Sequence, residues 1–345
     1  MPDAQPTRWS TAQLLTPVLV FAAAMLATVA VASPTVLAPQ LSRVSLDTNL
    51  VSVATSTAPV PTLDRCSVDR PAAAMLPPRR LLRSQRIVVV RPADRRIATV
   101  QASTALRRDD ADGGGCASPV LMAAVDRVTV ERTTAAPTGE SSIQTDSTRP
   151  AALLPHRDGL TYLAAPNTGT ELRFFDPVTR RSVPLVPLGT DTVDGLDVTR
   201  MRAEIPDTDL AALPGADPHS RITKPGAWFG WPGANVTADS HQRGSYTLWI
   251  DQKSGLIVDA EIAVTREYRA GDRRLTEFDA TLRYDAKTRK TLVAAARAQA
   301  RPIWLARRVV PLVAGLLAIA AIAGLLLHRR REPRGTEQGV AGDRP

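Results

Sequence analysis

Two long apolar stretches, one towards each end of the chain, are the strongest features of its hydrophobic pattern. The second covers 309–327 (VVPLVAGLLAIAAIAGLLL) and carries no charged side chain. As a helix, roughly nineteen residues span about 28 Å, close to the hydrocarbon thickness of a bilayer. A helix also satisfies every backbone polar group of such a segment in lipid. We therefore predict a transmembrane helix at 309–327 rather than a buried core helix.

The first apolar stretch, 14–32 (LLTPVLVFAAAMLATVAVA), follows a short polar start at 1–13. Two interpretations compete for it. A retained transmembrane helix or signal anchor would leave 1–13 in the cytoplasm. A cleaved signal peptide would use the small-x-small sequence Ala30-Val31-Ala32 before Ser33. We favour retention because the stretch is long for a cleaved signal, and both interpretations export the residues that follow.

Basic residues flank the second apolar stretch on both sides, so local charge alone leaves its orientation ambiguous. The flanking residues are Arg297, Arg301, Arg307 and Arg308 before it, and His328, Arg329, Arg330 and Arg331 after it. If the first stretch delivers 40–305 across the membrane, the second must return 328–345 to the cytoplasm as a basic tail. We therefore expect a two-pass plasma-membrane protein whose topology is set with the help of Arg329, Arg330 and Arg331.

The residues between the two stretches alternate between apolar and polar side chains in short runs, which is typical of antiparallel strands. The runs 86–91 and 96–101 predict one hairpin, and 246–251 with 256–262 predict another. Asp194-Gly195 is a tight-turn dipeptide inside 192–204. We expect an α+β, mainly β fold: an antiparallel extracytoplasmic domain over 40–305, flanked by N- and C-terminal transmembrane helices.

Two segments interrupt this β pattern. Residues 133–155 are rich in Thr, Ser, Ala and Pro, which predicts a linker or long loop and a candidate internal domain boundary. Residues 288–306 have a helical pattern that leads towards the second apolar stretch. Pro302 should kink or end this helix, and Trp304 fits an anchor at a membrane interface.

Composition narrows the set of partners. The 345 residues carry a net charge of +9, almost all of it from arginine, and the Ala, Pro and Val content suggests a high-GC bacterial genome. The arginines are interleaved with aspartates, and no run combines basic residues with stacking aromatics, so we do not expect nucleic acid as a partner. Membrane lipids and cell-envelope lipids or polymers fit better. The oligomeric state stays open.

The two cysteines, Cys66 and Cys116, predict one disulfide in an oxidising compartment, with buried free thiols as the alternative. Such a bond would close a loop of about fifty residues, for which the chain-entropy model gives about 4 kcal/mol of stabilisation.

The sequence contains no established catalytic signature: we find no nucleophile elbow, phosphate loop, HExxH or dinucleotide-binding glycines. His156, His219 and His241 lack ligand spacing, and Asp191, Asp194 and Asp197 are better explained as turn residues than as a calcium loop. We therefore expect no metal, no cofactor and no enzymatic activity. An extracytoplasmic hydrolase is disfavoured because no nucleophile–base set can be named.

Large aromatic residues gather at 228–233 (WFGWPG), where they favour a loop that closes one end of the β core. In the alternative interpretation, Trp228, Phe229 and Trp231, together with Trp304, contact membrane or a bound lipid, since indole is stable at an interface. An antiparallel sheet wrapped around an apolar ligand would use such a loop.

Several segments together resemble an actinobacterial family of unknown function whose members are labelled PorA-family porins. They are the N-terminal apolar segment, GLTYLAAPNTGTELRFFDPVTR, the hairpin YTLWIDQKSGLIVDAE, the strand around Asp126 and Arg127, and the terminal helix with its arginines. The resemblance covers about 14–330 and implies a cell-envelope location.

The porin label implies a channel, but outer-membrane barrels need amphipathic strands with aromatic girdles. This chain is 4% aromatic, and neither apolar stretch carries a polar stripe that could line water. We therefore expect a non-enzymatic binding or envelope-organising protein. A lipid-binding or lipid-transport protein with an apolar cavity and a channel-forming porin are the alternatives.

Overall fold

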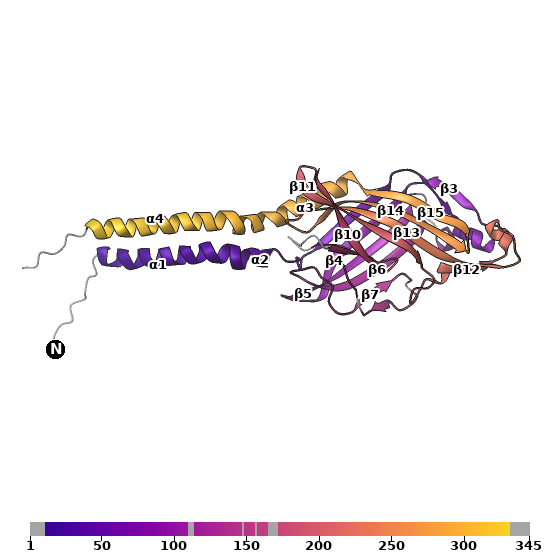
Figure 1. Ribbon diagram of the computed structural model, residues 1–345, viewed down its shortest axis with the longest axis horizontal. Helices are drawn as coiled ribbons and strands as arrows, with labels where there is room; N and C mark the ends of the chain where they lie inside the picture. Colours follow the sequence, from indigo (N-terminus) through magenta and orange to yellow (C-terminus); the bar gives the residue numbers. More distant parts are fainter. Residues whose placement is uncertain (1–10, 110–113, 147, 156, 165–171, 332–345) are drawn as a thin grey trace, which may run out of the picture. The chain divides into compact units, whose positions relative to one another are not determined.

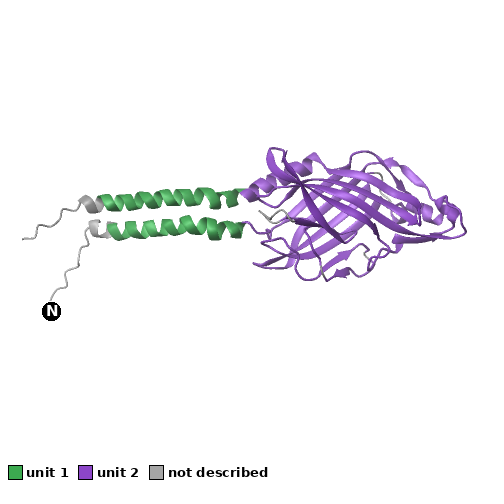
Figure 2. Cartoon of the chain, in the orientation of Figure 1, with its two compact units in different colours: residues 1–41, 301–345 green, residues 42–300 purple. Residues whose placement is uncertain are grey.

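The computed structural model describes residues 11–109, 114–146, 148–155, 157–164 and 172–331 (Figure 1). The chain divides into two compact units, coloured separately in Figure 2. One unit combines 1–41 with 301–345, and the other consists of 42–300. Each unit is described by itself.

Two long helical segments supply the first unit, and the second of them begins within 42–300 and enters the first unit at residue 301. Helix α1 (Thr11–Ala32) passes through a π-helical turn at Ser33–Leu37 into α2 (Ala38–Leu41). Helix α3 (Ala286–Trp304) passes through another π-helical turn at Leu305–Val309 into α4 (Val310–Arg331). A proline lies in or just before each turn, at Pro34 and Pro302, where its missing N–H interrupts the helical ladder. The predicted interruption at Pro302 is therefore a local widening after which the helix continues.

Small residues and a hydrogen bond from Ser33 join the two helices. The Ser33 hydroxyl donates to the carbonyl oxygen of Ala306 at 2.8 Å, so the two π-helical turns meet. Ala23, Ala314 and Ala318 are buried in this unit, and their small side chains allow close backbone approach.

Large apolar side chains cover the outside of the same helices. Leu312 and Leu316 are 66% and 67% exposed, and the apolar windows of both helices are almost entirely unburied. Both helices are long and apolar enough to cross a membrane. The predictions at 14–32 and 309–327 therefore fall on two real, long apolar helices.

The second unit contains a thirteen-stranded antiparallel sheet, with strand order β8-β7-β6-β5-β4-β1-β15-β14-β13-β11-β10-β9 and with β12 paired to β13. A small separate sheet pairs β2 with β3. The strands are β1 (Asn49–Ser56), β2 (Val60–Leu63), β3 (Met75–Arg79), β4 (Leu81–Ala93), β5 (Ile97–Arg108), β6 (Val120–Glu131), β7 (Ser141–Gln144), β8 (Ala152–Leu154), β9 (Leu172–Asp176), β10 (Arg181–Val193), β11 (Leu196–Asp209), β12 (Arg221–Lys224), β13 (Val236–Ile250), β14 (Ile257–Ala270) and β15 (Arg273–Tyr284).

Hairpins connect most neighbouring strands, as the alternating sequence indicates. The predicted pairs at 86–101 and 246–262 fall on β4–β5 and β13–β14. Asp194 and Gly195 form the β10–β11 turn with φ of 46° and 72°, the left-handed backbone that such a two-residue turn requires. The pairing of β1 with β15 joins residues far apart in the sequence and closes the centre of the sheet.

The sheet curls around its own core. Strands β1, β4, β9, β13, β14 and β15 all contribute residues to one interior cavity, so their inner faces converge. Alternate residues of β14, such as Val258, Ala260 and Ile262, are buried on that inner face. The fold class is therefore mainly antiparallel β with two long apolar helices, as expected.

The segment 133–155 differs from the expectation of a linker and domain boundary. It contains β7 and β8, which extend the main sheet, and the unit 42–300 shows no division among its described residues. Ser141 and Ile143 face inwards and are 3% and 1% exposed. The polar composition of the whole segment obscured these two inward positions.

Candidate functional site

A cavity of about 390 Å³, partly open to the surface, lies between β6, β14 and the loop that follows β11. Its walls are largely apolar, with Leu63, Leu121, Met122, Leu210, Leu213 and Ile222 among the lining residues. This volume falls within the range of about 300–1,000 Å³ that small-molecule sites occupy. The cavity is therefore large enough for part of a lipid-sized molecule.

Charged side chains line one region of this cavity. The Arg266 side chain donates from Nε and Nη2 to the Gln242 Oε1 atom at 3.1 and 2.7 Å, and Nη2 lies 3.3 Å from the Met122 sulfur. The Arg266 guanidinium also lies 5.5 Å from the ring centroid of Phe278. Glu277 is 6% exposed, with a carboxylate oxygen 3.7 Å from Arg65 Nη2. The cavity thus combines apolar walls with buried charge.

The disulfide predicted from the two cysteines is present at the edge of the cavity. Cys66 and Cys116 are bonded, and the bond joins the short 3-10 turns Arg65–Asp69 and Gly115–Ala117. Cys116 itself lines the cavity. The Arg65 side chain donates to the carbonyl oxygens of Val120 and Leu121. This crosslink therefore holds an edge of β6 beside the cavity.

The aromatic loop at 228–233 packs against side chains that line the cavity. Trp228 and Phe229 are 2% and 5% exposed, and Phe229 stacks on Trp231 with ring centroids 4.4 Å apart. Trp228 Nε1 donates to the Ser67 carbonyl at 2.8 Å. Their cluster includes Leu63, Ile222 and Tyr268, which also line the cavity.

This burial agrees with the interpretation of the loop as a closing element. Contact with a membrane does not fit Trp228 and Phe229, because burial among their neighbours removes them from the surface. Trp304, by contrast, is 55% exposed.

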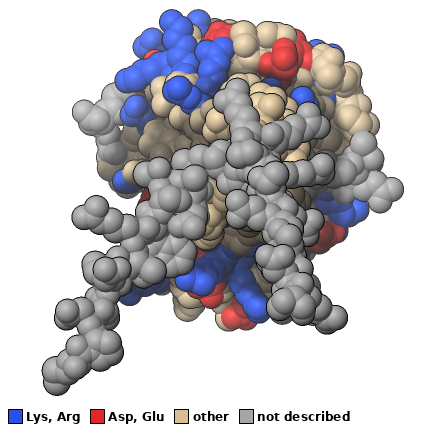
Figure 3. Space-filling view, turned by 90° about the vertical axis from the view of Figure 1, so that its left-hand side faces the viewer, with Lys and Arg blue, Asp and Glu red and all other residues tan. Residues whose placement is uncertain are grey.

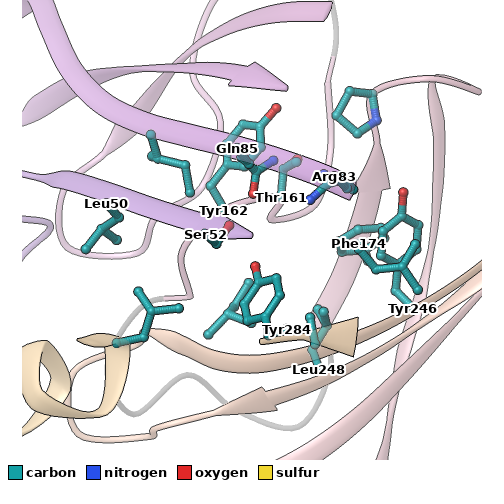
Figure 4. Close-up of a pocket in the computed structure, with 16 residues that line it drawn as sticks. Leu50, Ser52, Arg83, Gln85, Thr161, Tyr162, Phe174, Tyr246, Leu248 and Tyr284 are labelled. Atoms are coloured by element: carbon teal, nitrogen blue, oxygen red, sulfur yellow. The ribbon is translucent and has the colours of Figure 1, made fainter. Parts of the chain in front are cut away.

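A second, smaller cavity of about 50 Å³ lies elsewhere along the curled sheet (Figure 4). Figure 4 shows Tyr162, Tyr246 and Tyr284 around this space, together with Arg83 and Gln85. Strand β14 passes both cavities, with Ile262 at the smaller and Arg266 at the larger. The Tyr246 hydroxyl donates to Asp176 at 2.9 Å. Burial raises the pKa of Tyr246 well above its ordinary value, so this phenol stays protonated.

The segment 157–164 fills part of the interior of the sheet. The Arg157 guanidinium makes two hydrogen bonds to the Asp126 carboxylate, at 2.7 and 2.9 Å, and both side chains are almost fully buried. The Tyr162 hydroxyl donates to the same carboxylate at 2.5 Å. Burial, and then the Asp126 charge, raise the pKa of Tyr162. Arg157 also lies 4.2 Å from the Phe175 ring centroid. These contacts fix the segment inside the sheet.

The described turn aspartates and histidines make separate contacts. Asp191 accepts a hydrogen bond from Trp249 Nε1 at 2.8 Å, which lowers the pKa of its carboxyl group. His241 contacts Asp207, and His219 lines the large cavity. Within the described ranges, no three His, Cys, Asp or Glu side chains are grouped as metal ligands would be. His156 lies outside the described residues.

The basic tail can be located only through its backbone. Arg329, Arg330 and Arg331 are the last residues of α4, and their side chains lie outside the described part of the chain. Their predicted role in topology stays a prediction.

Further basic residues gather where 42–300 begins. The Arg43 side chain donates to the Arg95 carbonyl at 3.1 Å, and Arg132 donates to the carbonyls of Val44 and Asp94. Arg43 follows the end of α2 at Leu41 by two residues, so it must lie close to the end of an apolar helix. On the face seen in Figure 3, Lys and Arg side chains form patches beside scattered Asp and Glu.

Sequence reasoning missed the residues that give the cavity its buried charge, Arg266 and Glu277. It also missed Arg157, which pairs with Asp126 elsewhere in the sheet. The one available signal was the interruption of the inward apolar positions of β14, where Arg266 follows Ile262 and Val264 at the same alternation.

A curled antiparallel domain with an amphipathic cavity, carried by a chain with two apolar helices, defines a class of membrane-associated β protein. A family model described as Porin PorA matches residues 15–326, so the chain belongs to the Porin PorA family. A curated relative, Porin PorA of Corynebacterium amycolatum, is 25% identical over 301 residues, with 74% of this chain and 76% of that protein covered. The resemblance seen in the sequence is therefore confirmed at the level of the family.

Proposed function

We propose that this protein is a two-pass plasma-membrane protein whose extracytoplasmic β domain binds an amphipathic cell-envelope molecule, such as a lipid, without enzymatic chemistry. The observation that carries the proposal is the cavity of about 390 Å³, with its apolar walls and its few buried charges. Ligand sites typically combine such walls with a small number of polar groups.

The anchoring part of the proposal rests on the two apolar helices and their surroundings. Exposed leucines such as Leu312 and Leu316 need an apolar environment, which a bilayer supplies. In this proposal the exposed Trp304 lies at the membrane interface, and Arg43 with Arg132 contacts anionic lipid headgroups. Residues 1–13 and 328–345 then lie in the cytoplasm, and membrane lipids or envelope polymers are the expected partners.

A channel is the function that the name of the relative suggests. Two arrangements inside the sheet favour binding instead. Arg266 bonds to the buried Gln242 beside the larger cavity, and Arg157 with Asp126 holds the segment 157–164 in the interior. Filled space of this kind suits a binding domain better than an open, water-filled pore.

The test is mass spectrometry of the full chain, released intact from lipid particles, with identification of any molecule that remains bound. Ala124 lines the cavity, so Ala124→Phe adds a ring to its interior. Val186 is 53% exposed on β10 and lines neither of the two cavities described above, so Val186→Phe is the matched control.

We expect wild type and Val186→Phe to retain a bound amphipath, and Ala124→Phe to lose most of it at unchanged far-UV circular dichroism. Equal retention by all three proteins would place the bound molecule outside the cavity. Absence of any retained molecule from wild type would contradict the proposal.

A further inference from the structure

The Glu277 carboxylate is an unusual group for the wall of an apolar cavity. Its side chain is 8% exposed, and it lies on β15 where the register with β14 shifts at Arg266 and Glu267. Its ion pair is with Arg65, at 3.7 Å, which is too far for a hydrogen bond. Burial, and then the charge of Glu277, raise the pKa of Tyr268, which lines the same cavity. An ionised carboxylate can accept about four hydrogen bonds. The arrangement therefore leaves acceptor capacity that faces the cavity.

A donor complements this acceptor on the neighbouring strand. The described hydrogen bonds of Arg266 use Nε and Nη2, both towards Gln242. In the described part of the chain, Nη1 has no hydrogen-bond partner. Arg266 is 9% exposed and lines the same cavity as Glu277. A ligand in the cavity would thus meet a buried acceptor and a buried donor together.

The charges around the cavity indicate which kind of polar group fits. Three arginines and three acidic residues line it: Arg65, Arg180, Arg266, Asp69, Asp217 and Glu277. A phosphate would meet the acidic side chains, and an ammonium group would meet the guanidinium groups. A hydroxyl group both donates and accepts, so it can satisfy a carboxylate and a guanidinium without an opposing charge.

We infer that the cavity takes a neutral amphipath with a hydroxyl-bearing headgroup, such as a glycosyl or polyol lipid. Its hydroxyls donate to Glu277 and accept from Arg266 Nη1, while its alkyl chain packs on Leu121, Leu210 and Leu213. This inference rests on the proposed function, because it specifies the ligand of the same cavity.

The experiment compares three headgroups on one alkyl chain: octyl glucoside, octyl phosphate and octyltrimethylammonium. The full chain is held in an amphipathic polymer, and native mass spectrometry counts the molecules bound as each probe is titrated. The Ala124→Phe variant serves as the background control, because probe bound to it has partitioned into the polymer. Its signal is subtracted from that of wild type. This comparison on the wild-type protein needs no variant at the charged positions.

Glu277→Gln then removes the carboxylate charge at nearly constant shape. Asp279→Asn is the matched control, because Asp279 is exposed on the outer side of the same strand, where it accepts from Thr265. We expect wild type and Asp279→Asn to bind octyl glucoside at least tenfold more tightly than either charged probe, and Glu277→Gln to lose about tenfold in affinity for the glucoside.

The outcomes separate this inference from the proposed function. Equal affinity for the three headgroups, or unchanged glucoside affinity in folded Glu277→Gln, would overturn the headgroup assignment while the cavity remains a lipid site. Preference for octyl phosphate would overturn it in favour of an anionic ligand. Failure of all three probes to bind wild type beyond the Ala124→Phe background would overturn the cavity site itself.

Discussion

Removal of Arg157 should destabilise the β domain strongly, because it leaves the Asp126 charge buried without its main partner. The two side chains are 1% and 2% exposed and share two hydrogen bonds, at 2.7 and 2.9 Å. Among the described residues, the Tyr162 hydroxyl would then be the remaining hydrogen-bond donor to the Asp126 carboxylate. A buried ion pair that loses one member typically costs about 3–5 kcal/mol.

The cost translates into a measurable melting shift. For a domain of roughly 250 residues, 1 kcal/mol corresponds to about 2 °C, so Arg157→Leu should lower Tm by about 6–10 °C. Intrinsic tryptophan fluorescence of the full chain in lipid particles, followed on heating, is the assay. Asp158→Ala is the control. The side chains of Asp158 and its partner Arg173 are 69% and 45% exposed, so this ion pair should contribute less than about 1 kcal/mol.

The double variant sharpens this test. In Asp126→Leu with Arg157→Leu, both charges are replaced by apolar side chains, which is often close to neutral for a buried pair. Its Tm should therefore lie above that of Arg157→Leu alone. Additive losses in the double variant, or a shift below about 2 °C in Arg157→Leu, would refute the buried-charge argument.

Three further predictions follow from other parts of the molecule. Replacement of Cys66 and Cys116 by serine should lower stability by about 4 kcal/mol, or about 8 °C in Tm, and a reductant should reproduce this loss in wild type but leave the variant unchanged. Burial raises the pKa of Asp259 above 3.8 in the folded state, so the folded protein binds this proton more tightly than the unfolded chain does. The free energy of unfolding of wild type, relative to that of Asp259→Asn, should therefore fall as pH rises through the raised pKa. Parallel curves of stability against pH for the two proteins would contradict this. Lipids with brominated chains should quench less fluorescence in Trp304→Phe than in wild type, whereas Trp228→Phe should leave the quenched component in place, because Trp228 is buried.

The parts of the fold that depend on local pattern could be predicted from the sequence. The apolar helices could be predicted from the length and composition of uncharged stretches such as 309–327. The β10–β11 hairpin is set by the Asp194-Gly195 dipeptide, which adopts the backbone that a tight turn needs. In each case the determining residues are neighbours in the chain.

The curl of the sheet and the cavity could not be predicted in this way. The pairing of β1 with β15 joins residues around Ala54 and Tyr284, and no local signal encodes this choice of partner. The cavity is the volume that the inward side chains of the curled sheet leave unoccupied, and that volume depends on how they pack after folding. The alternation of β14 puts Arg266 at an inward position. Its hydrogen bond to Gln242 and its place in the same cavity as Glu277 become apparent only in the folded domain.

The disulfide and the aromatic loop could be predicted in part from the sequence. The pairing of Cys66 with Cys116 was predictable because the chain has two cysteines. The aromatic loop left two interpretations open, because a run of tryptophans fits either a core or an interface. Trp228 is buried and donates to the Ser67 carbonyl, a contact between residues far apart in the chain that no local signal could reveal.

The most direct test of the account is a cryo-EM map of the full chain in a lipid nanodisc, enlarged with a bound antibody fragment. The account predicts elongated, non-protein density in the cavity, with its polar end beside Glu277 and Arg266 and its chain along Leu213. An empty or water-filled cavity in a well-resolved map, or collapse of the Leu213 loop onto Met122, would contradict it.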